Sequence, residues 1–282
     1  MAESTRKSGR ATALLGALVT LAAASPACSQ TVGIASAVVN DVKVSNTVVQ
    51  QPHQVVVRQQ MALADLVQTG QRSYMQMTLL DRSTFSIGAN ARITIDRFVY
   101  DPARARSFTS SIAKGAFRFL SGERSSRHDA TVNTPVSTLG IRGTIAEGLV
   151  GEDAVAIARD ERIIDTKTRV DTAKATLVLL RGPGAKTQGG LESGFITVTA
   201  AGQTVSLNQP SLAVFVAGPD VPPSSPFMLS KKGLRRFQEL LMPPLGQWRR
   251  SATNSRRRHD GRMNGGWDAP PPFEFEPMQI KP

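Results

Sequence analysis

Residues that could carry chemistry are few in this sequence and lie far apart. The three histidines, His53, His128 and His259, share no metal-ligand spacing with each other or with acidic residues. No serine stands in a Gly-x-Ser-x-Gly motif, and the single cysteine, Cys28, follows an apolar segment near the amino terminus. The sequence therefore predicts no catalytic residue, no cofactor site and no metal site, and it indicates a protein that is not an enzyme.

Two acidic pairs and one glycine-rich segment are the remaining candidates for chemistry. The pairs at 152–153 and 160–161 stand in turn-like sequence, where hydration is their usual role. The segment GPGAKT at 182–187 ends like a phosphate-binding loop, but it contains a proline and no apolar helix follows it. We interpret all three segments as turns.

The chain is strongly basic. Its 282 residues include 34 Lys and Arg against 22 Asp and Glu, a formal net charge of +12. Such a charge attracts nucleic acid, anionic lipid or an acidic polymer and does not by itself choose among them. With one cysteine, the chain can form neither an intramolecular disulfide nor a thiolate metal cluster.

The amino-terminal segment has the pattern of a secretory signal peptide. A basic stretch at 1–10 precedes an uncharged run at 11–24, and small residues follow it. The run is shorter than the roughly 20 residues that span a bilayer. We therefore predict a signal peptide at 1–28, no transmembrane span in the mature chain and a location in the periplasm or cell envelope. Cys28 leaves two interpretations open, cleavage by ordinary signal peptidase and attachment of a lipid anchor at this cysteine.

The sequence pattern predicts short strands, and these would position the residues of any binding site. From residue 31 to about residue 216, apolar and polar residues alternate with period two, and turn residues interrupt them every 8 to 12 positions. This pattern predicts an all-β domain at 31–217. Core candidates are Met75, Met77, Leu79, Phe85, Ile87, Ile93 and Ile95. Later strands are expected at 155–158, 176–180, 195–199, 205–207 and 213–216.

The composition changes after Gly218. Eleven of the 17 prolines and two arginine runs fall in the last 64 residues, so residues 218–282 are predicted to be a largely disordered basic tail. One exception is 230–241, where Ser230 can cap a short helix. Leu234, Phe237 and Leu241 would share one face of it. That helix either packs against the β domain or serves as a basic amphipathic element for lipid or a partner.

Three segments, in order, carry a family resemblance. The first spans residues 66–102 and ends in FVYDP, the second is GAFRFLSG at 115–122, and the third ends in TPVSTLGIRGT at 134–144. Together they resemble the FecR-type domain of Gram-negative bacteria, with the best match over 34–144. The resemblance implies one compact β domain of solenoid or twisted-sheet character that is exported, has no known catalytic residues and binds rather than reacts.

Two features depart from the family pattern. In the best-known members, this domain is the periplasmic half of an anti-sigma regulator that receives a signal from an outer-membrane transporter. The segment before the apolar run here has only ten residues, too few for a cytoplasmic anti-sigma domain. Arg82 stands where the family usually has the glycine of an Asp-Gly turn, which requires either a left-handed residue or another turn type.

The motif residues of the third segment are interpreted as structural. They are Thr134, Pro135, Gly140, Ile141, Arg142, Gly143 and Thr144. Glycine within a strand pattern marks a bulge or a close backbone approach. If Arg142 is buried, it needs an acidic partner, and the candidates are Asp96, Asp101 and Glu147. We hypothesise that Arg142 fixes this corner to a neighbouring strand.

The function expected from these observations is a non-enzymatic envelope module. It would bind another envelope protein or a surface polymer, in cell-surface signalling or in envelope assembly. The alternative is a polyanion-binding protein that acts through its basic tail. Export argues against nucleic acid as the partner.

Overall fold

The computed structural model describes residues 30–100, 106–122, 128–165, 167–182 and 194–242. Strands dominate it, which confirms the predicted all-β class. The predicted signal peptide with Cys28, and residues 243–282 of the predicted tail, lie outside the described residues.

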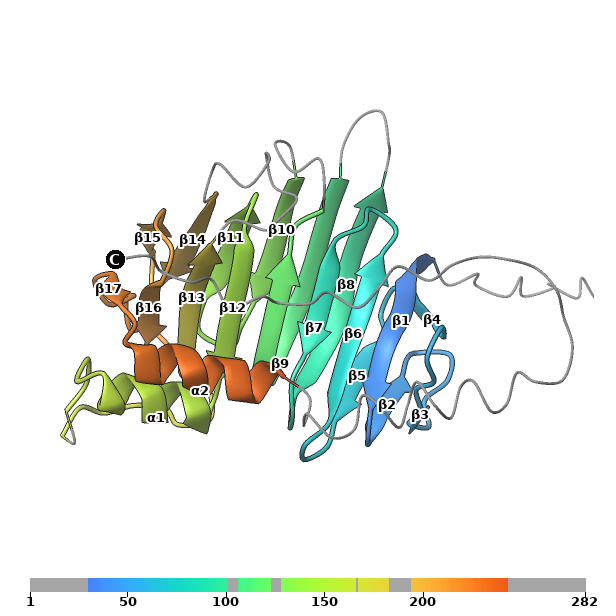
Figure 1. Ribbon diagram of the computed structural model, residues 1–282, viewed down its shortest axis with the longest axis horizontal. Coiled ribbons are helices and arrows are strands. Elements are labelled where there is room, and N and C mark those ends of the chain that lie inside the picture. The colour runs from blue at the N-terminus through green and yellow to red at the C-terminus, as the bar shows by residue number, and fades with distance from the viewer. Residues whose placement is uncertain (1–29, 101–105, 123–127, 166, 183–193, 243–282) are drawn as a thin grey trace, which may run out of the picture.

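The strands form two open sheets that face each other (Figure 1). Sheet A is antiparallel throughout and runs in the order β4 (Gln60–Ala62), β1 (Thr31–Val39), β6 (Tyr74–Leu79), β7 (Thr84–Ile87), β9 (Arg106–Leu120), β12 (Ile145–Val150), β13 (Thr176–Gly182), β16 (Leu212–Val216) and β17 (Phe227–Met228). Sheet B runs in the order β3 (His53–Gln54), β2 (Val42–Ser45), β5 (Leu66–Thr69), β8 (Arg92–Tyr100), β9, β10 (His128–Asn133), β11 (Thr138–Arg142), β14 (Phe195–Ala200) and β15 (Gln203–Leu207). In sheet B only the β9–β10 pair is parallel.

Strand β9 belongs to both sheets. Its first part pairs with β8 and β10 in sheet B, and its last part, from Gly115 on, pairs with β7 and β12 in sheet A. Gly115 has φ +95°, and a Cβ there would lie 2.4 Å from the Cα of Ala91. Only glycine fits this bend without strain.

The main core lies between the sheets. Alternate residues of each strand point into it, as the period-two pattern predicts. Every predicted core residue is buried, among them Met75, Phe85 and Ile93. Phe85 packs against Phe108 with ring centroids 5.3 Å apart, so aromatic rings from β7 and β9 meet at the centre.

Two helices cover part of the outer face of sheet A. They are α1 (Glu152–Asp160) and α2 (Lys231–Leu241), which lie across one end of the strands in Figure 1. They form a second core with Leu149, Leu177 and Phe215 of the sheet. Helix α1 corrects the strand expected at 155–158. Its buried residues are Ala154, Val155, Ile157 and Ala158. Spacings of three and four residues place them on one face of a helix.

Helix α2 confirms the helix predicted at 230–241. The Ser230 hydroxyl accepts a hydrogen bond from the Gly233 N–H at 3.1 Å and caps it. Phe237 and Leu241 are buried against the sheet, so the helix packs on the β domain. The described structure therefore continues to Met242, beyond residue 217 where composition placed the end of the β domain.

The β6–β7 turn uses a left-handed residue in place of glycine. Arg82 has φ +65°, which corresponds to the first of the two alternatives, a left-handed residue. Neither described helix is long and apolar enough to cross a membrane.

Candidate functional site

The predicted motif residues at 134–144 hold turns in place. The Thr134 hydroxyl accepts a hydrogen bond from the Ser137 N–H at 3.0 Å and closes the β10–β11 turn, in which Pro135 is exposed. The Thr176 hydroxyl donates to the Thr134 hydroxyl at 3.1 Å. Because Thr176 belongs to sheet A, this contact joins the two sheets.

The following motif residues carry the chain from sheet B to sheet A. Ile141 is buried, and a Cβ on Gly140 would lie 2.6 Å from the Thr197 hydroxyl oxygen of β14. Gly143 has φ +62°. Thr144 is fully buried and donates to the Gly182 carbonyl at 2.9 Å. All four residues lie in this crossover.

The condition under which Arg142 would need an acidic partner, its burial, is not met. Arg142 is exposed, and its guanidinium carbon lies 5.0 Å from the centroid of the Phe195 ring. The register explains the exposure, because Arg142 alternates with the buried Ile141 on the outer side of sheet B. Glu147, one of the three expected partners of Arg142, binds Arg118.

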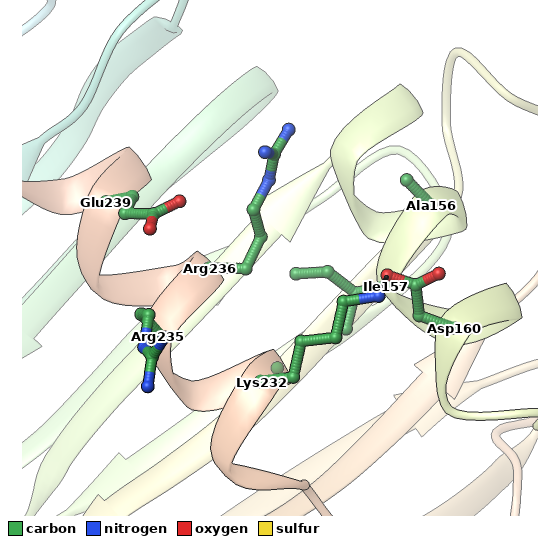
Figure 2. A pocket seen from close by; sticks show the side chains of 8 residues that line it. Ala156, Ile157, Asp160, Lys232, Arg235, Arg236 and Glu239 are labelled. Atoms are coloured by element: carbon green, nitrogen blue, oxygen red, sulfur yellow. Dashed lines mark ion pairs between the residues drawn. The ribbon is translucent and has the colours of Figure 1, made fainter.

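A groove between α1 and α2 is the first hollow to consider (Figure 2). Lys232 lies 2.9 Å from Asp160, and Arg236 lies 3.2 Å from Asp153. The acidic pairs expected in turns thus stand at the two ends of α1, and one acid of each pair, Asp153 and Asp160, binds α2. Two of the four cations of α2 are neutralised in this way, so the groove joins two helices and is no candidate for an anion site.

The stronger candidate is the part of sheet A that the helices leave open. Strand register places two neighbouring rows of side chains across its outer face. The charged row consists of Ala37, Gln76, Ser86, Arg118 and Glu147. The next position along it, Leu179 of β13, is buried under the helices. The outer row consists of Ile34, Thr78, Thr84, Leu120 and Ile145. Every residue of the outer row is at least partly exposed, and Ile34 is 41% exposed. We call the two rows together the open face.

A buried carboxylate lies at the centre of the charged row. The Glu147 side chain is fully buried. Its Oε1 accepts a hydrogen bond from Arg118 Nε at 2.8 Å and forms an ion pair with Arg118 Nη2 at 2.7 Å. Arg181 Nε lies 4.0 Å from the same oxygen. The other oxygen, Oε2, has no hydrogen-bond partner among the described groups. Two guanidinium groups therefore share one carboxylate oxygen.

Polar side chains extend this cluster across β7 and β6. The Tyr74 hydroxyl lies 3.1 Å from the Ser86 hydroxyl and 3.0 Å from Gln76 Oε1. Burial raises the pKa of the Tyr74 hydroxyl above its ordinary value of 10.0, while the Ser86 hydrogen bond and the positive charge of Arg118 offset part of the rise. Tyr74 is therefore a neutral hydrogen-bonding group at physiological pH.

The open face offers hydrogen-bond donors and positive charge but no nucleophile paired with a base. Sequence reasoning missed it, although one signal was present: in GAFRFL, Phe117 and Phe119 point into the core, so Arg118 between them must point outward. Nothing in the sequence pairs Arg118 with Glu147, which is 29 residues away. In the described parts of the chain, no three His, Cys, Asp or Glu side chains gather where they could hold a metal ion.

Comparison with known families decides what kind of domain this is. Residues 65–182 match the family described as FecR protein. The chain contains a FecR domain. The match begins and ends later than the best match predicted from motifs, 34–144, and it covers β5 to β13 with α1. Arg118, Glu147 and Arg181 all lie within it, whereas α2 lies outside.

The likeness of this FecR domain protein to solved structures is weaker than its match to the family. Two crystal structures, both described as a candidate anti-sigma factor from Parabacteroides distasonis ATCC 8503, align at 12% and 11% identity with TM-scores of 0.39 and 0.40. Each alignment covers 60% of this chain and 62% of the crystallised chain. The protein thus matches less than two thirds of the length of these structures. No curated protein matches the chain.

Proposed function

We propose that this protein is a non-enzymatic binding module of the cell envelope, in which the FecR domain engages another envelope protein as part of signalling or envelope assembly. The observation that carries the proposal is the open face of sheet A. A sheet face of a folded domain is normally covered or polar throughout. Here a charged centre lies beside partly exposed apolar residues, which is the composition of a protein interface.

Chemical crosslinking of intact cells tests the proposal. The full-length chain, purified under denaturing conditions after crosslinking, should bring down one reproducible protein of the envelope. A matched sample without crosslinker controls for adhesion to the resin. Recovery of cytosolic proteins alone, or of no protein, would overturn the proposal.

Export through a signal peptide at 1–28 is part of the same proposal. A fusion of residues 1–40 to a reporter that is active only outside the cytoplasm should be active. A fusion in which the apolar run at 11–24 carries two arginines should not. Mass spectrometry of the mature amino terminus then distinguishes ordinary cleavage from lipid attachment at Cys28. An inactive first fusion would contradict an envelope location.

The alternative, polyanion binding through the basic tail, predicts a different experiment. Affinity for a polyanion such as heparin should fall steeply with salt and disappear when residues 243–282 are deleted. The neutralisation of Lys232 and Arg236 by α1 removes part of the charge that such binding would use.

A further inference from the structure

The charges on the open face do not balance. Glu147 and Arg118 are the charged residues of the two rows. Arg181 of β13 lies beside the rows at the register shift between β12 and β13 and shares Glu147 with Arg118. Both side chains reach the surface, since those of Arg118 and Arg181 are 22% and 30% exposed. The cluster therefore presents one unneutralised positive charge to whatever lies on the face.

The hydrogen bonds of the cluster are also incomplete. Arg118 directs Nε and Nη2 to one oxygen of Glu147, and a guanidinium group carries five N–H donors in all. The 4.0 Å separation of Arg181 Nε from that oxygen is too long for a hydrogen bond. Glu147 Oε2 is a buried acceptor that no described group satisfies. Such groups are rare in folded proteins and call for an explanation.

A carboxylate would neutralise the remaining positive charge of this cluster and accept hydrogen bonds from the arginines, although it has no hydrogen to donate to Glu147 Oε2. Both arginines lie within 4.0 Å of one oxygen atom, so a second carboxylate placed over them could accept hydrogen bonds from both guanidinium groups. Acids and arginines would then alternate around the cluster. A polyphosphate or an anionic lipid surface would need several cations in a row. The cluster has two cations, Arg118 and Arg181, and they already share one acid.

The outer row indicates what surrounds that carboxylate. Ile34, Leu120 and Ile145 lie in the row next to the arginines and are partly exposed. Neighbouring strands are about 4.8 Å apart. A partner segment that runs across the strands would therefore meet one side chain of each row at every strand. Apolar residues on either side of the acid would cover this row.

We propose that the open face binds an acidic side chain of a partner protein, held between Arg118 and Arg181 with flanking apolar residues on the outer row. This inference rests on the proposed function, since it names the surface and the chemistry through which the FecR domain engages its partner. Glu147 acts as the group that orients both arginines and touches the partner only through them.

A photocrosslinking amino acid at Thr84 tests the inference in intact cells that produce the full chain. Thr84 lies in the outer row beside Leu120, and the same probe at Gln203 of β15, in sheet B, is the positional control. The Thr84 probe should capture an envelope protein at a segment that contains Asp or Glu. Adducts of only the chain itself, of lipid or polysaccharide, or of a segment without an acid would overturn the inference.

Charge variants supply the second arm. Arg181 is the residue to change, because removing Arg118 would leave Glu147 buried without its main partner. Arg181→Gln should lower the Thr84 crosslink yield about tenfold, and Arg181→Glu should lower it further. Arg92→Gln, on an exposed arginine of β8 in sheet B, should leave it unchanged. Circular dichroism confirms that each variant is folded, and an unchanged yield in folded Arg181→Glu would overturn the inference.

The two proposals can fail separately. If the Gln203 probe captures an envelope protein and the Thr84 probe does not, the protein is a binding module that uses another surface. If chemical crosslinking and both probes capture no envelope protein, the proposed function fails together with the inference.

Discussion

Burial of Glu147 is costly for folding, and in the proposed interaction this residue orients the two arginines that hold the partner. A buried carboxylate loses its hydration and is tolerated because Arg118 binds it through two nitrogens. Arg118→Leu should therefore lower the free energy of unfolding by about 3–5 kcal/mol, since Glu147 would remain buried without its main partner. Urea denaturation followed by circular dichroism measures this change.

The double variant Arg118→Leu with Glu147→Leu is the control. Removing both charges leaves no buried ion, so most of the lost stability should return. If the double variant is as unstable as Arg118→Leu alone, the instability arises from packing, and the account of this ion pair is wrong.

Tyr74 should give the protein a specific dependence on alkaline pH. Because folding raises the pKa of its hydroxyl above 10.0, the folded state favours the protonated form. The resulting stability is present below the ordinary pKa and is lost as pH rises through the folded-state value. Tyr74→Phe should cost about 1 kcal/mol at neutral pH through its lost hydrogen bonds, yet lose less stability than the wild type between about pH 9 and about pH 11.

Thermal denaturation across this range measures the difference. Tyr100→Phe, at the other tyrosine of the chain, which is 38% exposed, is the matched control. Parallel pH profiles for Tyr74→Phe and the wild type would contradict the assigned burial of the hydroxyl.

At the scale of elements, α2 is the outer wall of the second core. Phe237 is fully buried between α2 and sheet A, whereas its neighbour Gln238 is exposed. Phe237→Ala should lower the free energy of unfolding by about 3–5 kcal/mol, the range for deleting a buried aromatic side chain. Gln238→Ala should change it by less than about 0.5 kcal/mol. Equal stability of the two variants in urea would show that α2 does not pack on the sheet.

The helices also show what a sequence pattern can and cannot predict. The spacing of Leu234, Phe237 and Leu241 after a capping serine predicts α2 correctly, because its two faces differ sharply. Helix α1 is short and apolar on a wide face, so Val155 to Ala158 looks the same as a buried strand. The sequence around the acids of α1 does not indicate which residues they bind, since Asp153 and its partner Arg236 are 83 residues apart.

For the molecule as a whole, the period-two alternation predicts the strands and the core, because each strand has one face in the core. It does not predict which strands share a sheet. That arrangement depends on bends such as Gly115, where β9 passes from sheet B to sheet A. The open face shares this limit, since it is assembled from five strands spread over more than a hundred residues.

Gly115 should therefore be critical for the whole fold. Gly115→Ala places a Cβ 2.4 Å from the Ala91 Cα at φ +95°, so we expect a loss of more than about 4 kcal/mol or failure to fold. Gly202→Ala is the control, because Gly202 also has a positive φ of +73° but has no atom within 4 Å of the added carbon. It should cost about 1 kcal/mol. Similar melting temperatures for both variants would contradict the bend.

The central claim is that the FecR domain works by binding, through an acid of a partner held at Arg118 and Arg181. A charge exchange tests it most directly. Once the Thr84 crosslink identifies the acidic residue of the partner, Arg181→Glu and the change of that acid to arginine should each abolish binding of the purified proteins, and the two together should restore it. Undiminished binding by Arg181→Glu, or no recovery in the exchanged pair, would contradict the claim.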